Sequence, residues 1–196
     1  MKLFYLISVT LLGGLFLSMA ASTQTQERTI KLIKWPDEPL QITKLEVGGK
    51  EVNFNHSFSA EGDDWFRGLA VSVKNTSSQT IHFIVLGLTF ESSGGGDIPS
   101  GDHLLYGCQP PLSEGIAPQC EQPPLKPNEA ATLVLQSYEE TRTFLNATGK
   151  PQNINGFEMS IGEVIFADGK MWNGGQILKR DPNNPNRWLS EKKPVN

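Results

Sequence analysis

The sequence predicts a mainly β protein: an antiparallel β-sandwich with one short helix and one long loop tied by a disulfide bond. Apolar and polar residues alternate with a period of two over several short segments, which is typical of half-buried strands. Glycine and proline, which favour turns, are frequent, with 19 and 13 copies. The segment that begins at Ser137 carries the pattern of a helix start.

The first 20 residues have the pattern of a secretory signal peptide. An apolar run over residues 3–17 follows Lys2, and Ser18-Met19-Ala20 places small residues where the peptidase needs them. Cleavage after Ala20 is preferred to cleavage after Ala21 or an uncleaved anchor, because the run is shorter than the roughly 20 residues of a membrane span. We expect a secreted or periplasmic protein with no membrane span after cleavage.

The remaining chain predicts a disordered tether at 21–27, a single β-sandwich domain at 28–189 and a loose tail at 190–196. This length is enough for one sizeable core. The formal net charge of −4, without a basic block, argues against nucleic acid or an anionic membrane surface as partner. Cys108 and Cys120 fit an oxidising compartment.

The N-terminal part of the domain predicts three strands, at residues 28–34, 41–47 and 51–58. Pro36 ends the first strand, because proline cannot continue a hydrogen-bonded ladder. Gly48 and Gly49 join the second and third strands, since glycine allows the positive φ that hairpin turns need.

Residues 68–91 predict the central hairpin, two apolar strands joined by the turn-forming residues 75–79. The second strand is apolar on both faces: His82, Ile84, Leu86, Leu88 and Phe90 share one, and Ile81, Phe83 and Val85 share the other. A strand of this kind is expected to be central and covered on both sides. We expect a helix or folded loop from later in the chain to cover the second face.

Residues 92–126 are rich in glycine and proline and predict a long irregular loop, either functional or mobile. A turn at 125–129 then leads into a strand at 130–136. Ser137 and Glu140 form a capping box for a helix that ends near Ala147, the candidate cover for the central strand.

The C-terminal part predicts a strand at 156–167, in which strict alternation would bury Glu163. A bulge at Gly162 would leave this carboxylate in water. Asp168-Gly169 is a hairpin turn, followed by a return strand at 170–179. A turn at 181–186 precedes Trp188 and Leu189, which are expected to dock on the domain.

Two segments resemble known protein groups. VSVKNTSSQTIHFIVLGLTF (71–90), followed by LKPNEAATLVL (125–135), resembles small Ig-like bacterial extracytoplasmic domains such as the FxLYD type, although the FxLYD signature is absent. DDWFRGLAVSVKNTS (63–77), VIFADGKMWNGG (164–175) and RDPNNPNRW (180–188) are similar to secreted bacterial proteins with no known activity. The resemblance implies an Ig-like sandwich and export, and it carries no site residue.

Cys108 and Cys120 are predicted to form a disulfide bond across a proline-rich loop. The bond is either a staple for a long insertion or the base of a recognition loop. Trp35, Trp65, Trp172 and Trp188 could stack on sugar rings if they were exposed in a row. Trp65, Trp172 and His103 are the candidate ligand contacts. The alternative interpretation of the tryptophans is core packing.

We expect a non-catalytic exported protein without cofactor or metal, which binds another envelope protein or a carbohydrate. The alternative is a periplasmic hydrolase or metal-dependent enzyme that uses Asp97, Asp102 and His103, three side chains that could meet at a metal ion. Loop acids are usually only solvated, and the chain has no EF-hand, phosphate-binding loop or serine-hydrolase elbow. A third interpretation is a protease inhibitor that presents the cysteine loop.

Overall fold

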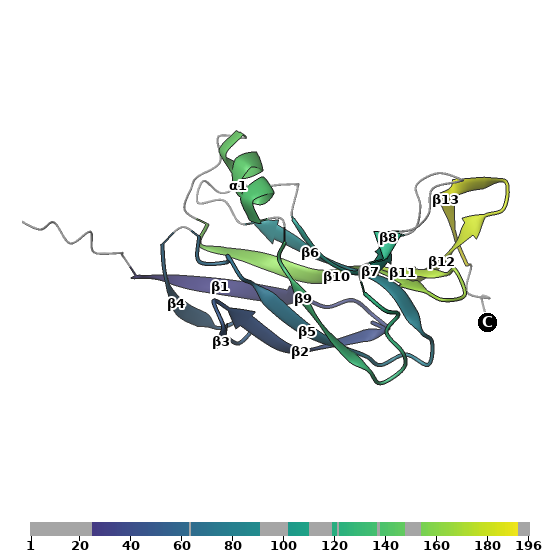
Figure 1. Ribbon diagram of the computed structural model, residues 1–196, viewed down its shortest axis with the longest axis horizontal. Helices are drawn as coiled ribbons and strands as arrows, with labels where there is room; N and C mark the ends of the chain where they lie inside the picture. Colours follow the sequence, from purple (N-terminus) through teal and green to yellow (C-terminus); the bar gives the residue numbers. More distant parts are fainter. Residues whose placement is uncertain are drawn as a thin grey trace, which may run out of the picture.

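The protein is a β-sandwich of two stacked sheets (Figure 1). The computed structural model describes residues 25–62, 64–90, 102–109, 119–120, 122–136, 138–147 and 154–191. The smaller sheet contains β2 (Leu40–Val47), β3 (Lys50–Glu51), β5 (Ala70–Asn75) and β9 (Ala130–Val134). The larger sheet contains β1 (Thr25–Ile33), β4 (Ser57–Glu61), β6 (Ile81–Phe90), β7 (His103–Gln109), β8 (Gln119–Cys120), β10 (Gly156–Phe166), β11 (Met171–Asn173), β12 (Gln176–Asp181) and β13 (Asn184–Ser190). The predicted mainly β sandwich is confirmed.

Strand β10 organises the larger sheet. One edge pairs with β6 along the whole strand, while the other edge is shared by β1, which runs parallel to it, and β11. The register shifts between Ile161 and Glu163, so the bulge predicted at Gly162 is confirmed. Val164 and Phe166 are buried beyond the bulge, and Glu163 is half-buried.

The predicted central hairpin is wrong, because β5 and β6 belong to different sheets. Strand β5 pairs with β2 and β9, and β6 pairs with β10 and β7. The connecting turn crosses between the sheets around the buried Asn75, whose Nδ2 donates to the carbonyls of Gln79 (2.8 Å) and Leu125 (3.0 Å). These bonds satisfy a buried amide and hold the crossing in place.

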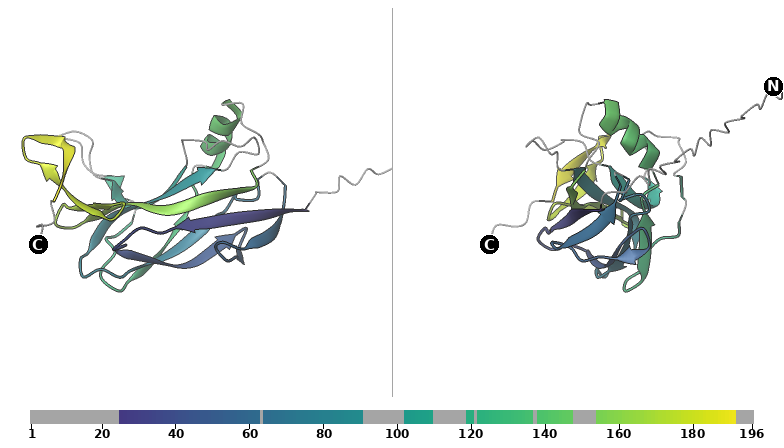
Figure 2. Two further views of the ribbon diagram at one scale, coloured as in Figure 1. Left: turned by 180° about the vertical axis from the view of Figure 1, so that it is seen from behind. Right: turned by 90° about the vertical axis from the view of Figure 1, so that its left-hand side faces the viewer.

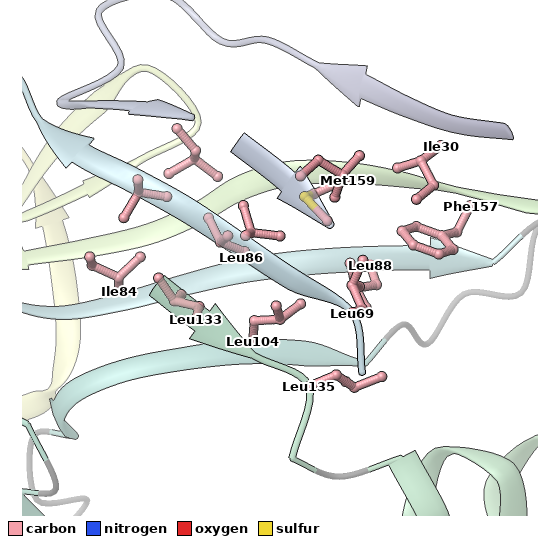
Figure 3. Packing of buried hydrophobic residues seen from close by; sticks show 14 of the residues in the cluster. Ile30, Leu69, Ile84, Leu86, Leu88, Leu104, Leu133, Leu135, Phe157 and Met159 are labelled. Carbon is pink, nitrogen blue, oxygen red and sulfur yellow. The ribbon is translucent and has the colours of Figure 1, made fainter. Parts of the chain in front are cut away.

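The main core lies between the two sheets. Figure 3 shows Leu86 and Leu88 of β6 gathered with Phe157 and Met159 of β10. Leu69 lies on the smaller sheet's side and is fully buried. At one end of the core, Phe66 contacts Phe90, Phe157 and Tyr138 with ring centroids 5.2–6.4 Å apart. Such aromatic pairs add to the hydrophobic gain of burial.

The second face of β6 is covered, as predicted, but the predicted cover was wrong. Phe83, Ile165 and Met171 form a separate cluster, and the half-buried Leu178 of β12 and Trp188 of β13 pack on it. We call these five residues the outer cluster. Helix α1 (Tyr138–Ala147) forms over the predicted residues, but it packs Tyr138 against Phe66 of the main core.

The predicted faces of β6 are also wrong at the start of the strand. Ile81 belongs to the main core and is fully buried, whereas His82 is half-buried. The cause is a second register shift, between Ile165 and Phe166, which displaces the pairing of β6 with β10 at this end.

Other predicted strand limits need correction. Thr25–Glu27, predicted as tether, begin β1 and pair with β4. The strand predicted at 51–58 is interrupted after Glu51, and Asn55 has a φ of 61°, because the chain crosses there from the smaller sheet to the larger one. The predicted loop at 92–126 contains β7, which pairs with β6.

The C-terminal corrections concern two hairpins. The predicted return strand is split into β11 and β12 by a turn in which Gly174 and Gly175 have φ values of 54° and 85°. The turn predicted at 181–186 begins at Asp181, but Asn184 already pairs with it in β13. Trp188 and Leu189 dock within β13, and the predicted tail beyond 191 lies outside the described residues.

Two elements rise on the side of the larger sheet that faces away from the smaller sheet. Figures 1 and 2 show α1 toward one end of this outer face and the β12–β13 hairpin at the other. Thr141 of α1 donates a hydrogen bond to Asp102, next to the start of β7. The middle of the outer face therefore lies between two raised ends.

Candidate functional site

The structure separates the predicted ligand-contact residues. Trp172 is 2% exposed and Trp65 is 5% exposed, so neither indole offers a free face for stacking on a sugar. His103 is exposed at the start of β7. Of the two interpretations of the tryptophans, ligand contact and core packing, the burial of Trp65 and Trp172 supports core packing.

The predicted acidic loop site stays a prediction, and among the described residues no group of three His, Cys, Asp or Glu side chains comes together. Asp97 lies outside the described residues. Asp102 accepts hydrogen bonds from Thr141 and from the backbone N–H of His103 (2.7 Å). These contacts give Asp102 a role in joining α1 to β7.

One hollow lies beside the edge strand β4, and we call it the edge groove. It encloses about 640 Å³ between β4, the β2–β3 turn and the first residue of β1. Its apolar lining is Val47, Val52, Phe58, Ala60 and Trp65, and the exposed charged side chains at it are Lys50, Glu51 and Glu61. Strand β4 pairs only with β1 among the described strands, so its other edge has no partner strand in this part of the chain.

A buried arginine supports the floor of the edge groove. The Arg28 guanidinium donates to the carbonyls of Ile154 (2.6 Å) and Gly62 (3.1 Å) and lies 5.7 Å from the Trp65 ring. Trp65 Nε1 donates to the same Ile154 carbonyl at 2.8 Å, and Phe58 packs edge-on against the indole. These hydrogen bonds serve the two terminal nitrogens of a cation that burial alone would disfavour.

Arg28 was missed by sequence reasoning, although a signal existed. Arg28 lies on the same face of β1 as Ile30 and Leu32 in the period-two pattern. This pattern predicts an apolar residue at position 28, and the sequence has an arginine there. A charged side chain on the buried face of a strand indicates a specific set of partners.

The second hollow lies on the outer face of the larger sheet, and we call it the outer trough. It encloses about 220 Å³ and is lined by His103 of β7, Gly87 of β6, Ser160 and Glu163 of β10, and Trp35 and Asn173. Gly87 stands opposite both His103 and Ser160 in the strand register. Because Leu86 and Leu88 point into the core, this row points outward.

Trp35 borders the outer trough on a firmly held loop. Its backbone N–H donates to Glu38 Oε1 at 2.8 Å, and its side chain is 44% exposed. The following Pro36 lies so close to Gly175 that a Cβ there would sit 3.2 Å from the proline ring. Gly175, with its φ of 85°, allows the β11–β12 turn to hold this loop beside the trough.

Ser160, His103 and Glu163 share the outer trough but do not form a catalytic triad in this structure. Within the described residues no hydrogen bond joins any two of their side chains. A nucleophilic serine needs a base within hydrogen-bonding reach. The trough therefore offers polar groups to a ligand without an activated nucleophile.

The cysteines face each other in the strand register, with Cys108 of β7 opposite Cys120 of β8. No described cysteine is free. Directly opposed residues of antiparallel strands have Cα atoms about 4.5–5.5 Å apart, which is within the range that a disulfide can span.

The pKa shifts lie outside the two hollows. Burial raises the pKa of Tyr106, with a further contribution from Glu129, and its hydroxyl donates to the Pro123 carbonyl at 2.9 Å. Burial also raises the pKa of Tyr138 at the aromatic end of the core. No helix in the described part of the chain is long and apolar enough to cross a membrane.

Comparison of the chain with protein-family models, curated proteins and solved structures found no match.

Proposed function

We propose that this protein is an exported, non-catalytic binding domain that holds an extended segment of a partner polypeptide in the edge groove. The signal-peptide pattern of the first 20 residues supports export to the periplasm or the outside of the cell. The two stacked, mostly antiparallel sheets support an Ig-like type of sandwich, a scaffold that binds through its edges, loops and faces.

The free edge of β4 beside the edge groove carries this proposal. An edge strand directs backbone N–H and C=O groups outward, and the group that satisfies them best is another extended chain. Strand β4 is five residues long, so it offers only a short ladder. A partner therefore needs side-chain contacts in addition to backbone hydrogen bonds.

The groove supplies these contacts. Phe58 and Ala60 alternate with exposed residues along β4, and both line the groove with Val52. Successive side chains of an added strand point to opposite faces, so every second one would enter the groove. We expect a partner segment with apolar residues at alternate positions and few charges between them.

Selection from a random peptide display library tests the proposal, with the mature oxidised protein as bait. We expect selected peptides to share the alternating apolar pattern and to protect β4 amides from hydrogen exchange. The variant Ala60→Arg places a long charged side chain in the groove, and it should weaken peptide binding at least about tenfold, equivalent to about 1.4 kcal/mol.

The matched control is Val134→Arg on β9, an outer strand of the smaller sheet at which Val134 is 46% exposed. This control should bind the selected peptides as the wild type does. Peptides that bind Ala60→Arg with unchanged affinity, or that protect β9 instead of β4, would contradict the proposal.

The cysteine loop forms a second part of the proposal. We propose a disulfide bond between Cys108 and Cys120, supported by their opposed register and by the absence of a free thiol among the described cysteines. Strand β8 has only two residues, so its pairing with β7 contributes few hydrogen bonds. A covalent bond at this point would act as a staple for the edge of the larger sheet.

A further inference from the structure

The outer trough combines an exposed aromatic ring with polar side chains that have no partner in the described part of the chain. Within the described residues, no hydrogen bond or ion pair involves the side chain of His103, Ser160, Glu163 or Asn173. Three of these side chains are half-buried, and His103 is exposed. Their hydrogen-bonding capacity is therefore available to a ligand.

The floor of the trough is open because Gly87 has no side chain. A Cβ at this position would meet only the Ser160 hydroxyl, at 3.8 Å, so the glycine is not required by close packing. Glycine in a strand interior weakens the strand, and it often marks a site where another group approaches closely. The hollow of about 220 Å³ is suited to a single ring-sized group.

We infer that the outer trough binds one neutral pyranose unit of a glycan, with Trp35 as the stacking surface. An indole offers an apolar face, and a pyranose with equatorial substituents offers a matching flat face of C–H groups. The hydroxyl groups around such a ring both donate and accept hydrogen bonds, as the four polar side chains require.

The charge of the trough selects a neutral sugar over an acidic one. Among the described residues that line the hollow, Glu163 is the only acidic one, and none of them is a lysine or arginine. A sugar carboxylate would be placed near this uncompensated carboxylate, which is unfavourable in a partly desolvated site. A sugar hydroxyl instead donates a charge-assisted hydrogen bond to it.

This site is separate from the edge groove, and its test does not depend on the proposed peptide partner. Cellotetraose and tetra-N-acetylchitotetraose serve as neutral probes, with tetragalacturonate as the acidic comparison, each titrated to about 10 mM into the ¹⁵N-labelled mature protein. We expect at least one neutral probe to shift the amide signals of Gly87, Ser160 and Glu163. Of the four tryptophan indole signals, only that of Trp35 should move.

Two variants sharpen the result. Trp35→Ala, at an exposed position, should weaken binding of the neutral probe at least about tenfold. Glu163→Gln should weaken binding of the neutral probe, because it removes the charge-assisted hydrogen bond, and should increase binding of tetragalacturonate. The matched control is Val134→Ala on β9, which is as exposed as Trp35 and should leave the affinity unchanged.

The inference is overturned if no neutral probe shifts the trough signals, or if the shifts persist with unchanged affinity in Trp35→Ala. It is also overturned if tetragalacturonate binds the wild type as tightly as the neutral probes do. The variant Gly87→Leu fills the floor of the trough and tests whether the probe occupies that space. It should abolish the shifts while its unfolding transition stays cooperative.

Discussion

The inner and outer faces of β6 and β10 are buried in different ways. The inner face joins a continuous core in which Leu86, Ile161 and Val164 are at most 1% exposed. Within the described residues, β12 and β13 cover one end of the outer face, where they pack on Phe83 and Ile165. Beyond this outer cluster the same face opens into the outer trough.

The difference shows how one strand pair serves stability on one side and recognition on the other. The inner face meets a second sheet, so every position on it must be apolar and closely packed. In the described part of the chain the outer face meets the small β12–β13 hairpin at one end, and Gly87, Ser160 and Glu163 are tolerated a few residues away from Phe83. The least covered part of the sheet is where side chains are free to contact a ligand.

The largest expected effect comes from placing a charge on each face at neighbouring positions. Leu86→Asp should prevent folding, because it buries an unpaired carboxylate in the main core, and that cost approaches a domain's whole stability of about 5–15 kcal/mol. Val85→Asp, on the half-buried outer face, should cost about 1–2 kcal/mol and keep the fold. Circular dichroism and urea unfolding measure both.

A cooperative urea transition for Leu86→Asp would contradict the assignment of Leu86 to the main core. Loss of folding in Val85→Asp would show that the outer face is covered more completely than the described residues indicate. Either result would remove the contrast between the two faces.

Removal of the proposed disulfide bond tests whether β7, which borders the trough, is held by packing or by a covalent crosslink. In the chain-entropy model a bond that closes a loop of this size contributes about 3 kcal/mol. The double variant Cys108→Ser with Cys120→Ser should therefore melt at a lower temperature and keep the sandwich folded. Scanning calorimetry measures the loss.

Mass analysis of the alkylated, non-reduced protein tests the bond itself. Two modified cysteines would contradict it. A single cysteine variant, Cys108→Ser, serves as a further control, since it should lose as much stability as the double variant if the two residues act only as a pair.

Much of the fold could be predicted because period-two patterns record which strand positions are buried. The bulge at Gly162 was predictable for this reason, since Glu163 would otherwise have entered the core. The partner of each strand was less predictable. Residues 75–79 have the composition of a hairpin turn, but the buried amide of Asn75 makes them a crossing between sheets.

The candidate sites were harder to predict, because they depend on which segments meet in space. His103 was named from the sequence as a candidate ligand contact, which stays a prediction, whereas Trp35 borders the outer trough through the turn at Gly175, which is distant in the sequence. Trp65 and Trp172 have the same residue type and are buried. Residue type alone does not distinguish a stacking surface from a core residue.

The outer cluster should tolerate truncation better than the main core. Trp188→Ala removes a half-buried indole that packs on the cluster and lies 5.1 Å from the Arg180 guanidinium. We expect a loss of about 1–2 kcal/mol and increased binding of a hydrophobic dye, because Phe83 and Ile165 become exposed. Trp35→Ala is the matched control and should change stability by less than about 0.5 kcal/mol.

The smallest expected effect concerns Tyr138, which joins α1 to the inner core. Burial is the main cause that raises its pKa above the ordinary value of 10.0. Arg142 and Arg67 lower the pKa, while Asp64 and Glu139 raise it. Because the folded pKa lies above the unfolded one, the stability that the neutral phenol contributes is present below pH 10 and is lost as the pH rises through the folded pKa.

Comparison of the wild type with Tyr138→Phe separates the stability contributed by the Tyr138 phenol from that of the other groups that titrate in alkali. The two proteins should have similar melting temperatures at neutral pH, since the ring against Phe66 is kept. Above pH 10, where the unfolded phenol ionises, the wild type should lose stability faster than the variant. Tyr106→Phe should produce a difference of the same sign, because burial raises that pKa as well. Parallel melting curves for Tyr138→Phe and the wild type across this range would show that Tyr138 is open to solvent, and that the aromatic end of the core is not sealed by α1.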